Sequence, residues 1–193
     1  MRACAGLLAL FLASSAQAAS LEVEVLDGSG SPIPDAVVYA IAEGRRPPPP
    51  TRTAVLDQKN RMFVPHVLAI QTGTSVKFPN SDNVRHQVYS FSPAKRFQLP
   101  LYEGTPAAPI VFDKPGVVTL GCNIHDRMNA YVVVVDTPYF SETLDGRASL
   151  AGLPEGRYAV HVWYAGQRGD PETQAIALGA SEAHDVQFRI DRN

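Results

Sequence analysis

The stretch TLGCNIHDRMNAYVVVV, residues 119–135, is the most informative part of this chain. It sets Cys122, His125 and Met128 at even three-residue steps, directly before a run of valines. The valine run has no polar–apolar alternation, which is typical of a central strand covered on both faces. We therefore expect a short rigid loop at one end of a sheet, with three candidate metal ligands on it.

A fourth ligand has to come from elsewhere in the chain, which offers His66, His86, His161 and His184. His86 ends the polar loop NSDNVRH and leads directly into a strand, so it can meet the Cys122 loop at one end of a sandwich. A thiolate, two imidazoles and a weak thioether are the ligands of a blue-copper site. Each residue taken alone has an ordinary alternative role, such as a buried thiol or a gap-filling methionine. Tetrahedral zinc is the rival metal, although structural zinc usually has more than one cysteine.

The segments around this stretch are patterned as strands. LEVEVLD (21–27) alternates apolar and acidic residues, the period of a half-buried strand, and AVVYAIA follows after a turn. MFVPHVLAIQTGTSVKFPNSD predicts two strands around Gly73, and RHQVYSFS predicts another. PIVFDKPGVVTLGC predicts a hairpin around Lys114-Pro115-Gly116. No helix of ordinary length is expected, so the predicted fold class is all-β.

Prolines mark two boundaries in the chain. The four prolines in GRRPPPP (44–50) cannot join a sheet interior and favour a stiff extended spacer. Pro138 marks the second boundary, after which LDGRASLAGLPEGRYAVHVWYAG contains a tight turn and one long alternating strand. In that strand one face carries Tyr158, Val160, Val162 and Tyr164, and the other carries His161 and Trp163.

The N-terminus is patterned as a secretory signal peptide, residues 1–19. It has a basic start at Arg2, a short apolar run and the small-x-small motif Ala16-Gln17-Ala18. The apolar run is too short to cross a bilayer core of about 30 Å, and no other segment approaches a membrane span. Cys4 leaves with this peptide, so Cys122 is the lone cysteine of the mature chain in an oxidising compartment. The net charge of −2 gives no basic field for nucleic acid.

Residues 51–136 resemble a cupredoxin, the plastocyanin and amicyanin fold. The resemblance rests on FVPHVLAIQTGTSVKF, on NSDNVRH, and on FDKPGVVTLGCNIHDRM with its Cys-x-x-His-x-x-Met ending. The segment is also similar to exported bacterial cupredoxin-like proteins labelled "methylamine utilization protein". The resemblance implies one type 1 copper per chain. It implies His86, Cys122 and His125 as strong ligands and Met128 as the axial one.

Two positions depart from the family pattern. Cupredoxins commonly place asparagine after the first histidine, where it ties the two ligand loops together, and Gln87 stands there in this chain. Plastocyanins often place a large aromatic residue before the cysteine as part of an electron path, and Gly121 stands there. That electron path is therefore expected to be absent.

The flanking segments together resemble a carboxypeptidase regulatory-like or transthyretin-like sandwich. The motifs are VEVLDGSGSPIPDAVVYA before the proline run and LDGRASLAGLPEGRYAVHVWYAG after Pro138. The predicted fold is thus a cupredoxin Greek-key β-sandwich at 51–136 inserted into a second small β-sandwich. The two parts of that second sandwich are expected at 20–46 and 137–193. The alternative is that the first part supplies edge strands to the cupredoxin.

These features predict an exported blue copper protein that carries electrons in the periplasm. Its expected partners are redox proteins in the periplasm or at the membrane surface. We expect no enzyme, since a copper oxidase or nitrite reductase needs a second copper centre and more histidines than five. Two alternatives stay open: a periplasmic copper carrier or sensor, and a metal-free β-sandwich binding module.

Overall fold

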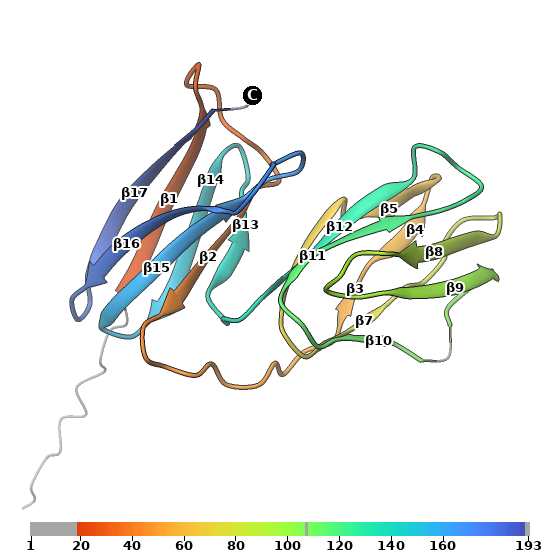
Figure 1. The fold of residues 1–193 in the computed structure, drawn as a ribbon, viewed down its shortest axis with the longest axis horizontal. Coiled ribbons are helices and arrows are strands. Elements are labelled where there is room, and N and C mark those ends of the chain that lie inside the picture. Colours follow the sequence, from red (N-terminus) through yellow and green to blue (C-terminus); the bar gives the residue numbers. More distant parts are fainter. Residues whose placement is uncertain (1–18, 107, 192–193) are drawn as a thin grey trace, which may run out of the picture.

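The computed structural model describes residues 19–106 and 108–191, and all seventeen regular elements in these ranges are β-strands (Figure 1). The all-β sandwich class is thereby confirmed. The predicted signal peptide lies outside the described residues except for Ala19, which opens β1. No helix within the described part of the chain has the length and apolar character needed to cross a membrane.

The first group of strands joins the N-terminal and C-terminal parts of the chain. A three-stranded sheet has the order β14-β1-β17 and faces a four-stranded sheet with the order β13-β2-β15-β16. The buried positions of β1 alternate with partly exposed ones, and they pack in one core with Val160 and Phe188. The strands are β1 (Ala19–Asp27), β2 (Val37–Ala42), β13 (Phe140–Glu142), β14 (Arg147–Leu153), β15 (Gly156–Trp163), β16 (Glu172–Leu178) and β17 (Ala183–Ile190).

The pairing of β1 and β2 decides where the N-terminal segment belongs. β1 runs parallel to β17 and antiparallel to β14, while β2 pairs with β13 and β15. The N-terminal strands therefore pair with the C-terminal part of the chain and are not edge strands of the central sheets. The exact domain bounds, 20–46, 51–136 and 137–193, stay a prediction.

The strands of the second group, β3 to β12, come in the sequence between the two parts of the first group. A five-stranded sheet has the order β6-β12-β11-β8-β9, a three-stranded sheet has the order β10-β7-β3, and β4 and β5 form a separate hairpin. Their shared core contains Phe63, Phe78, Phe112 and Val132. The strands are β3 (Ala54–Val55), β4 (Asp57–Lys59), β5 (Met62–Val64), β6 (Val67–Gln71), β7 (Thr74–Lys77), β8 (His86–Ser90), β9 (Phe97–Tyr102), β10 (Ile110–Phe112), β11 (Gly116–Gly121) and β12 (Asn129–Val135).

The predicted hairpin around Lys114-Pro115-Gly116 is wrong. β10 pairs with β7, whereas β11 pairs with β12 and β8. The segment after β10 therefore carries the chain from one sheet to the other. The physical reason is burial: Phe112 is fully buried in the core between the sheets, and β10 completes the smaller sheet beside β7.

The valines of β12 connect the two groups of strands. Val132 and Val134 face the core of the central sheets, whereas Val133 and Val135 belong to a third cluster with Trp163. Val37, Val67 and Ala69 complete the buried part of that cluster. The Ala69 N–H also donates a hydrogen bond of 2.8 Å to Glu142 Oε1. The predicted strand with both faces covered is confirmed, and its second cover includes Val37 and Trp163 of the other sandwich.

Candidate metal centre

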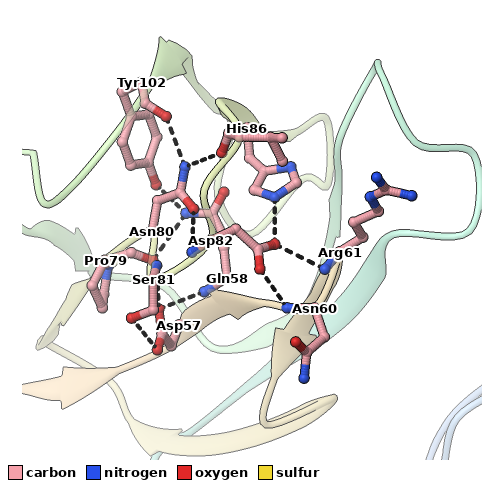
Figure 2. Close-up of polar contacts among 11 residues, drawn as sticks. Asp57, Gln58, Asn60, Arg61, Pro79, Asn80, Ser81, Asp82, His86 and Tyr102 are labelled. Atoms are coloured by element: carbon pink, nitrogen blue, oxygen red, sulfur yellow. Dashed lines mark hydrogen bonds and ion pairs between the residues drawn. The ribbon is translucent and has the colours of Figure 1, made fainter.

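The hairpin β4–β5 turns at two residues that hold a carboxylate. Asn60 and Arg61 both have positive φ, 55° and 58°, as a tight two-residue hairpin turn requires. Their backbone N–H groups donate to the two oxygens of Asp82, at 2.6 Å to Oδ1 and 2.8 Å to Oδ2 (Figure 2). The turn therefore fixes the position of the Asp82 side chain.

Asn80 orders the loop that carries Asp82. Its side-chain amide donates to the carbonyls of Val84 and Tyr102, at 2.9 and 2.8 Å, and its Oδ1 accepts from the Asp82 N–H (Figure 2). Ser81 is held in turn by the carboxylate of Asp57, at 2.8 Å. Because the loop is bonded at each of these points, it delivers the chain to β8 in one conformation.

His86 opens β8 and is fully buried. Its Nε2 lies 2.7 Å from Asp82 Oδ2. Burial acts to raise the pKa of Asp82, but hydrogen bonds from the Arg61 N–H, the His86 ring and the Asn60 N–H outweigh it and hold that pKa below its usual value. An ionised carboxylate only accepts hydrogen bonds, so the His86 proton is on Nε2. The lone pair of Nδ1 is then free to bind a metal.

The cysteine loop joins β11 to β12. Gly121 and Asn129 pair across the two strands, so the loop between them is anchored at both ends. Its last turn is closed by a 2.9 Å hydrogen bond from the Met128 N–H to the His125 carbonyl. Cys122 and Met128 are both buried, with 5% and 2% of their surface exposed. The loop therefore presents its sulfur atoms inward.

His86, Cys122 and His125 come together in a single cluster. One potential ligand atom from each lies within 4.8 Å of the others. The two imidazole rings are 5.0 Å apart between centroids and inclined at 58°. Among the described residues, Nδ1 of His86 and Nδ1 of His125 are buried and have no hydrogen-bond partner. Buried polar atoms in native proteins nearly always have a partner, so this pair of atoms marks the cluster as a metal site candidate.

The remaining predicted residue, Met128, shares a core cluster and an open depression of the surface with Cys122. Its role as axial ligand stays a prediction. His66, by contrast, is exposed and bonded to Asn129, and His161 and His184 lie on β15 and β17 in the other sandwich. The cluster could hold a metal ion and includes none of these three histidines.

Sequence reasoning missed Asp82. The signal available was its position four residues before His86 in the polar loop NSDNVRH. It also missed Asn80, whose amide secures the same loop. Gln87, the residue that departs from the family pattern, is buried where β8 has a register irregularity against β9. The loop is therefore tied by Asn80 from before the histidine.

Comparison with known proteins gives partial structural likenesses. No family model and no curated protein matches the chain. A purple cupredoxin from Nitrosopumilus maritimus is similar over 42% of this chain and 99% of its own, at 24% identity and a TM-score of 0.38. A Cu(I) form of an amicyanin variant is similar over 50% of this chain and 99% of its own, at 19% identity and a TM-score of 0.39.

A copper-containing nitrite reductase from Thermus scotoductus is also similar, at 24% identity and a TM-score of 0.41. The likeness covers 57% of this chain and 28% of the reductase. Likenesses at these identities and TM-scores carry no functional argument. The function proposed for this chain rests instead on the geometry of the His86, Cys122 and His125 cluster.

Proposed function

We propose that the central strands form a cupredoxin-type copper domain and that the protein carries single electrons. The observation that supports this most is the pair of buried, unbonded Nδ1 atoms of His86 and His125 beside the Cys122 thiol. Leaving a buried polar atom unsatisfied costs about 1–3 kcal/mol. A metal ion between them would satisfy both nitrogens and the sulfur at once.

The donor set favours copper over zinc. One thiolate, two imidazoles and a nearby thioether match a mononuclear electron-transfer copper site, whereas structural zinc sites usually use more cysteines. We propose one type 1 copper per chain, held by His86, Cys122 and His125 with Met128 as the weak axial ligand. Bound there, copper supplies a one-electron couple between Cu(I) and Cu(II).

The chain's own residues prepare the site. Asp82 binds Nε2 of His86, and this leaves Nδ1, the other ring nitrogen, buried and without a hydrogen-bond partner. Hydrogen bonds from a second residue to a ligating histidine fix its tautomer and orientation in this way. His86 is fully buried, which keeps water away from this ligand. A rigid and preformed ligand set changes little between the two charge states, which suits electron transfer.

The biological setting is part of the same proposal. We propose export to the periplasm through residues 1–19 and electron exchange with redox proteins there or at the membrane surface. We propose an electron carrier without enzymatic activity. The group of exported "methylamine utilization protein"-like cupredoxins fits this arrangement. The flanking sandwich would then be a regulatory-like binding or spacing module.

Titration with Cu(II) tests the proposal. The purified mature chain is expected to develop a strong thiolate-to-copper absorption that saturates at one equivalent. Cys122→Ala is expected to abolish it, and the control His66→Ala, outside the cluster, is expected to keep it. Absence of the absorption at stoichiometric copper would overturn the proposal. Rapid loss of Cu(I) to a modest chelator would indicate a copper carrier instead.

A further inference from the structure

Gly121 stands at the position where plastocyanins often have an aromatic residue of the electron path. In this chain an aromatic ring from the neighbouring strand covers that position. Tyr89 of β8 pairs directly with Gly121 of β11. A Cβ atom at position 121 would lie 2.7 Å from both Cζ and Oη of Tyr89. Real Cβ atoms do not approach other atoms so closely, so the ring occupies the space that a side chain at 121 would take.

The ring of Tyr89 contacts a second aromatic ring, that of Phe91, which reaches the surface. Phe91 lies two residues further along the chain, and its ring centroid is 5.2 Å from that of Tyr89, at an angle of 44°. Tilted rings at this spacing are in favourable contact. Phe91 is 71% exposed, which is high for a large apolar side chain. The aromatic pair thus extends from the backbone beside Cys122 to solvent.

The surface above this pair is hollowed toward the candidate metal ligands. An open depression of about 630 Å³ is lined by Tyr89, Phe91, Gly121, Cys122 and Met128, among others. The two residues that carry sulfur and the two that carry rings therefore line the same depression. The aromatic pair therefore lies on the same open face as Cys122 and Met128.

We propose that Tyr89 and Phe91 form the electron route between Cys122 and the protein surface. This inference rests on the proposed electron-carrier function. Electron tunnelling is faster through bonded atoms and packed π systems than through solvent, and Tyr89 supplies a π system in contact with the residue bonded to Cys122. A partner that is a one-electron redox protein would exchange its electron over Phe91. One electron moves, and no bond or proton changes.

An attached photo-oxidant tests this route. A ruthenium–bipyridine complex is coordinated to a histidine introduced by Phe91→His in the copper-loaded full chain. The label then takes the place of the Phe91 ring at the surface end of the route, and the experiment tests the step through Tyr89. The site starts as Cu(I), and a flash in the presence of a soluble electron acceptor oxidises the label from Ru(II) to Ru(III). The label then takes one electron from the site, which returns the label to Ru(II) and leaves the site as Cu(II). We expect Tyr89→Leu to slow this step severalfold and Tyr89→Phe, which keeps the ring, to restore it. Equal rates in the labelled Phe91→His protein with and without Tyr89→Leu would overturn the proposal.

Two controls separate the route from the integrity of the site. With the label moved by Val111→His to exposed β10 in the other central sheet, Tyr89→Leu should leave the rate unchanged. The thiolate absorption and the reduction potential should stay the same in all Tyr89 variants. If both rates fall together, or if absorption changes with the rate, Tyr89 acts structurally and the route is refuted.

A second variant covers the case in which Tyr89→Leu does not fold. Gly121→Ala keeps the ring but pushes its tip away from the backbone, because the new Cβ would collide with Cζ and Oη. We expect the same slowing with the label at 91, and an unchanged rate would overturn the route. If the native protein develops no thiolate-to-copper absorption with Cu(II), the electron-carrier function is refuted, and this route with it. A slow rate confined to the Tyr89 and Gly121 variants supports both.

Discussion

The Asp82 carboxylate accepts a 2.7 Å hydrogen bond from Nε2 of His86, a side chain with no exposed surface. Each carboxylate oxygen also receives a backbone N–H from the turn at Asn60 and Arg61. Both oxygens of Asp82 therefore accept hydrogen bonds: Oδ1 from the Asn60 N–H, and Oδ2 from the Arg61 N–H and the His86 ring. This arrangement makes the orientation of one candidate ligand depend on a residue outside the ligand set.

Asp82→Asn is expected to weaken metal binding. Whichever way the new amide is turned, its NH₂ group faces at least one N–H donor, so the hold on His86 is loosened. Loss of such a partner typically lowers metal affinity by about 10–100-fold. Competition between the protein and a Cu(I) chelator measures the change. Asp113→Asn removes a carboxylate that is bonded to Lys95 and should leave the affinity at the native value.

Met128→Leu is expected to change the spectrum and the reduction potential while the fold persists. The side chain is buried, and a volume-conserving apolar exchange usually costs less than about 1.5 kcal/mol. A weak axial thioether tunes the potential of a blue-copper site, so its loss should shift both the absorption and the potential. Met62→Leu, at an exposed position, is the control. An unaltered spectrum and potential would remove Met128 from the ligand set.

Trp163→Ala is expected to destabilise the chain strongly. Trp163 is 6% exposed and packs with Val133 and Val135 between the two sandwiches. Truncating a buried tryptophan to alanine usually costs about 3–5 kcal/mol. Urea unfolding followed by circular dichroism gives the free energy of unfolding. Leu144→Ala, at a side chain that is 79% exposed, should change it by no more than about 0.5 kcal/mol.

Stability is expected to fall below the ordinary pKa of histidine, about 6.5, partly because of His161. Burial lowers the pKa of His161, which stacks on Tyr39 and contacts Thr173 Oγ1 at 2.7 Å. The unfolded chain therefore binds this proton at a higher pH than the folded chain. Its contribution is fully present above the unfolded pKa and is lost as the pH falls toward the folded one.

His161→Gln should make the loss of stability on acidification shallower. Urea unfolding at a series of pH values, followed by Trp163 fluorescence, measures this slope. His66→Gln, at an exposed imidazole, should keep the native slope. A His161→Gln protein with the native pH dependence would contradict the assignment.

The sequence predicts the strands of this fold better than their pairing. The run Val132–Val135 predicts a doubly covered strand because lack of alternation reports burial on both faces. It does not say what covers each face, and Val133 and Val135 are covered by Trp163 from a strand far along the chain. The hairpin expected around Lys114-Pro115-Gly116 is wrong for the same reason, since a local turn signal cannot tell which sheet a strand will join.

For the candidate site, the sequence predicts the donors but not their surroundings. The rare residue types Cys122 and Met128 stand out because donors of copper are chemically specific. Asp82 and Tyr89 have no such signature, because each acts through a contact made only in the folded chain. At Gly121 the sequence indicated a missing ring. The ring comes from the adjacent strand, which no local motif could show.

The chain passes twice between the two sandwiches, leaving after β2 and returning before β13, and these two strands are hydrogen-bonded to each other. A single connection would leave the central sandwich, which carries the candidate metal site, free to rotate relative to the flanking sandwich. Two connections that start from paired strands, with Trp163 packed between the two sandwiches, restrict this rotation. A partner that binds the sandwich formed by the first group of strands therefore also meets Phe91 in a fixed orientation. Under the proposed electron-carrier function, the direction in which Phe91 faces a partner is set when the chain folds, before any partner arrives.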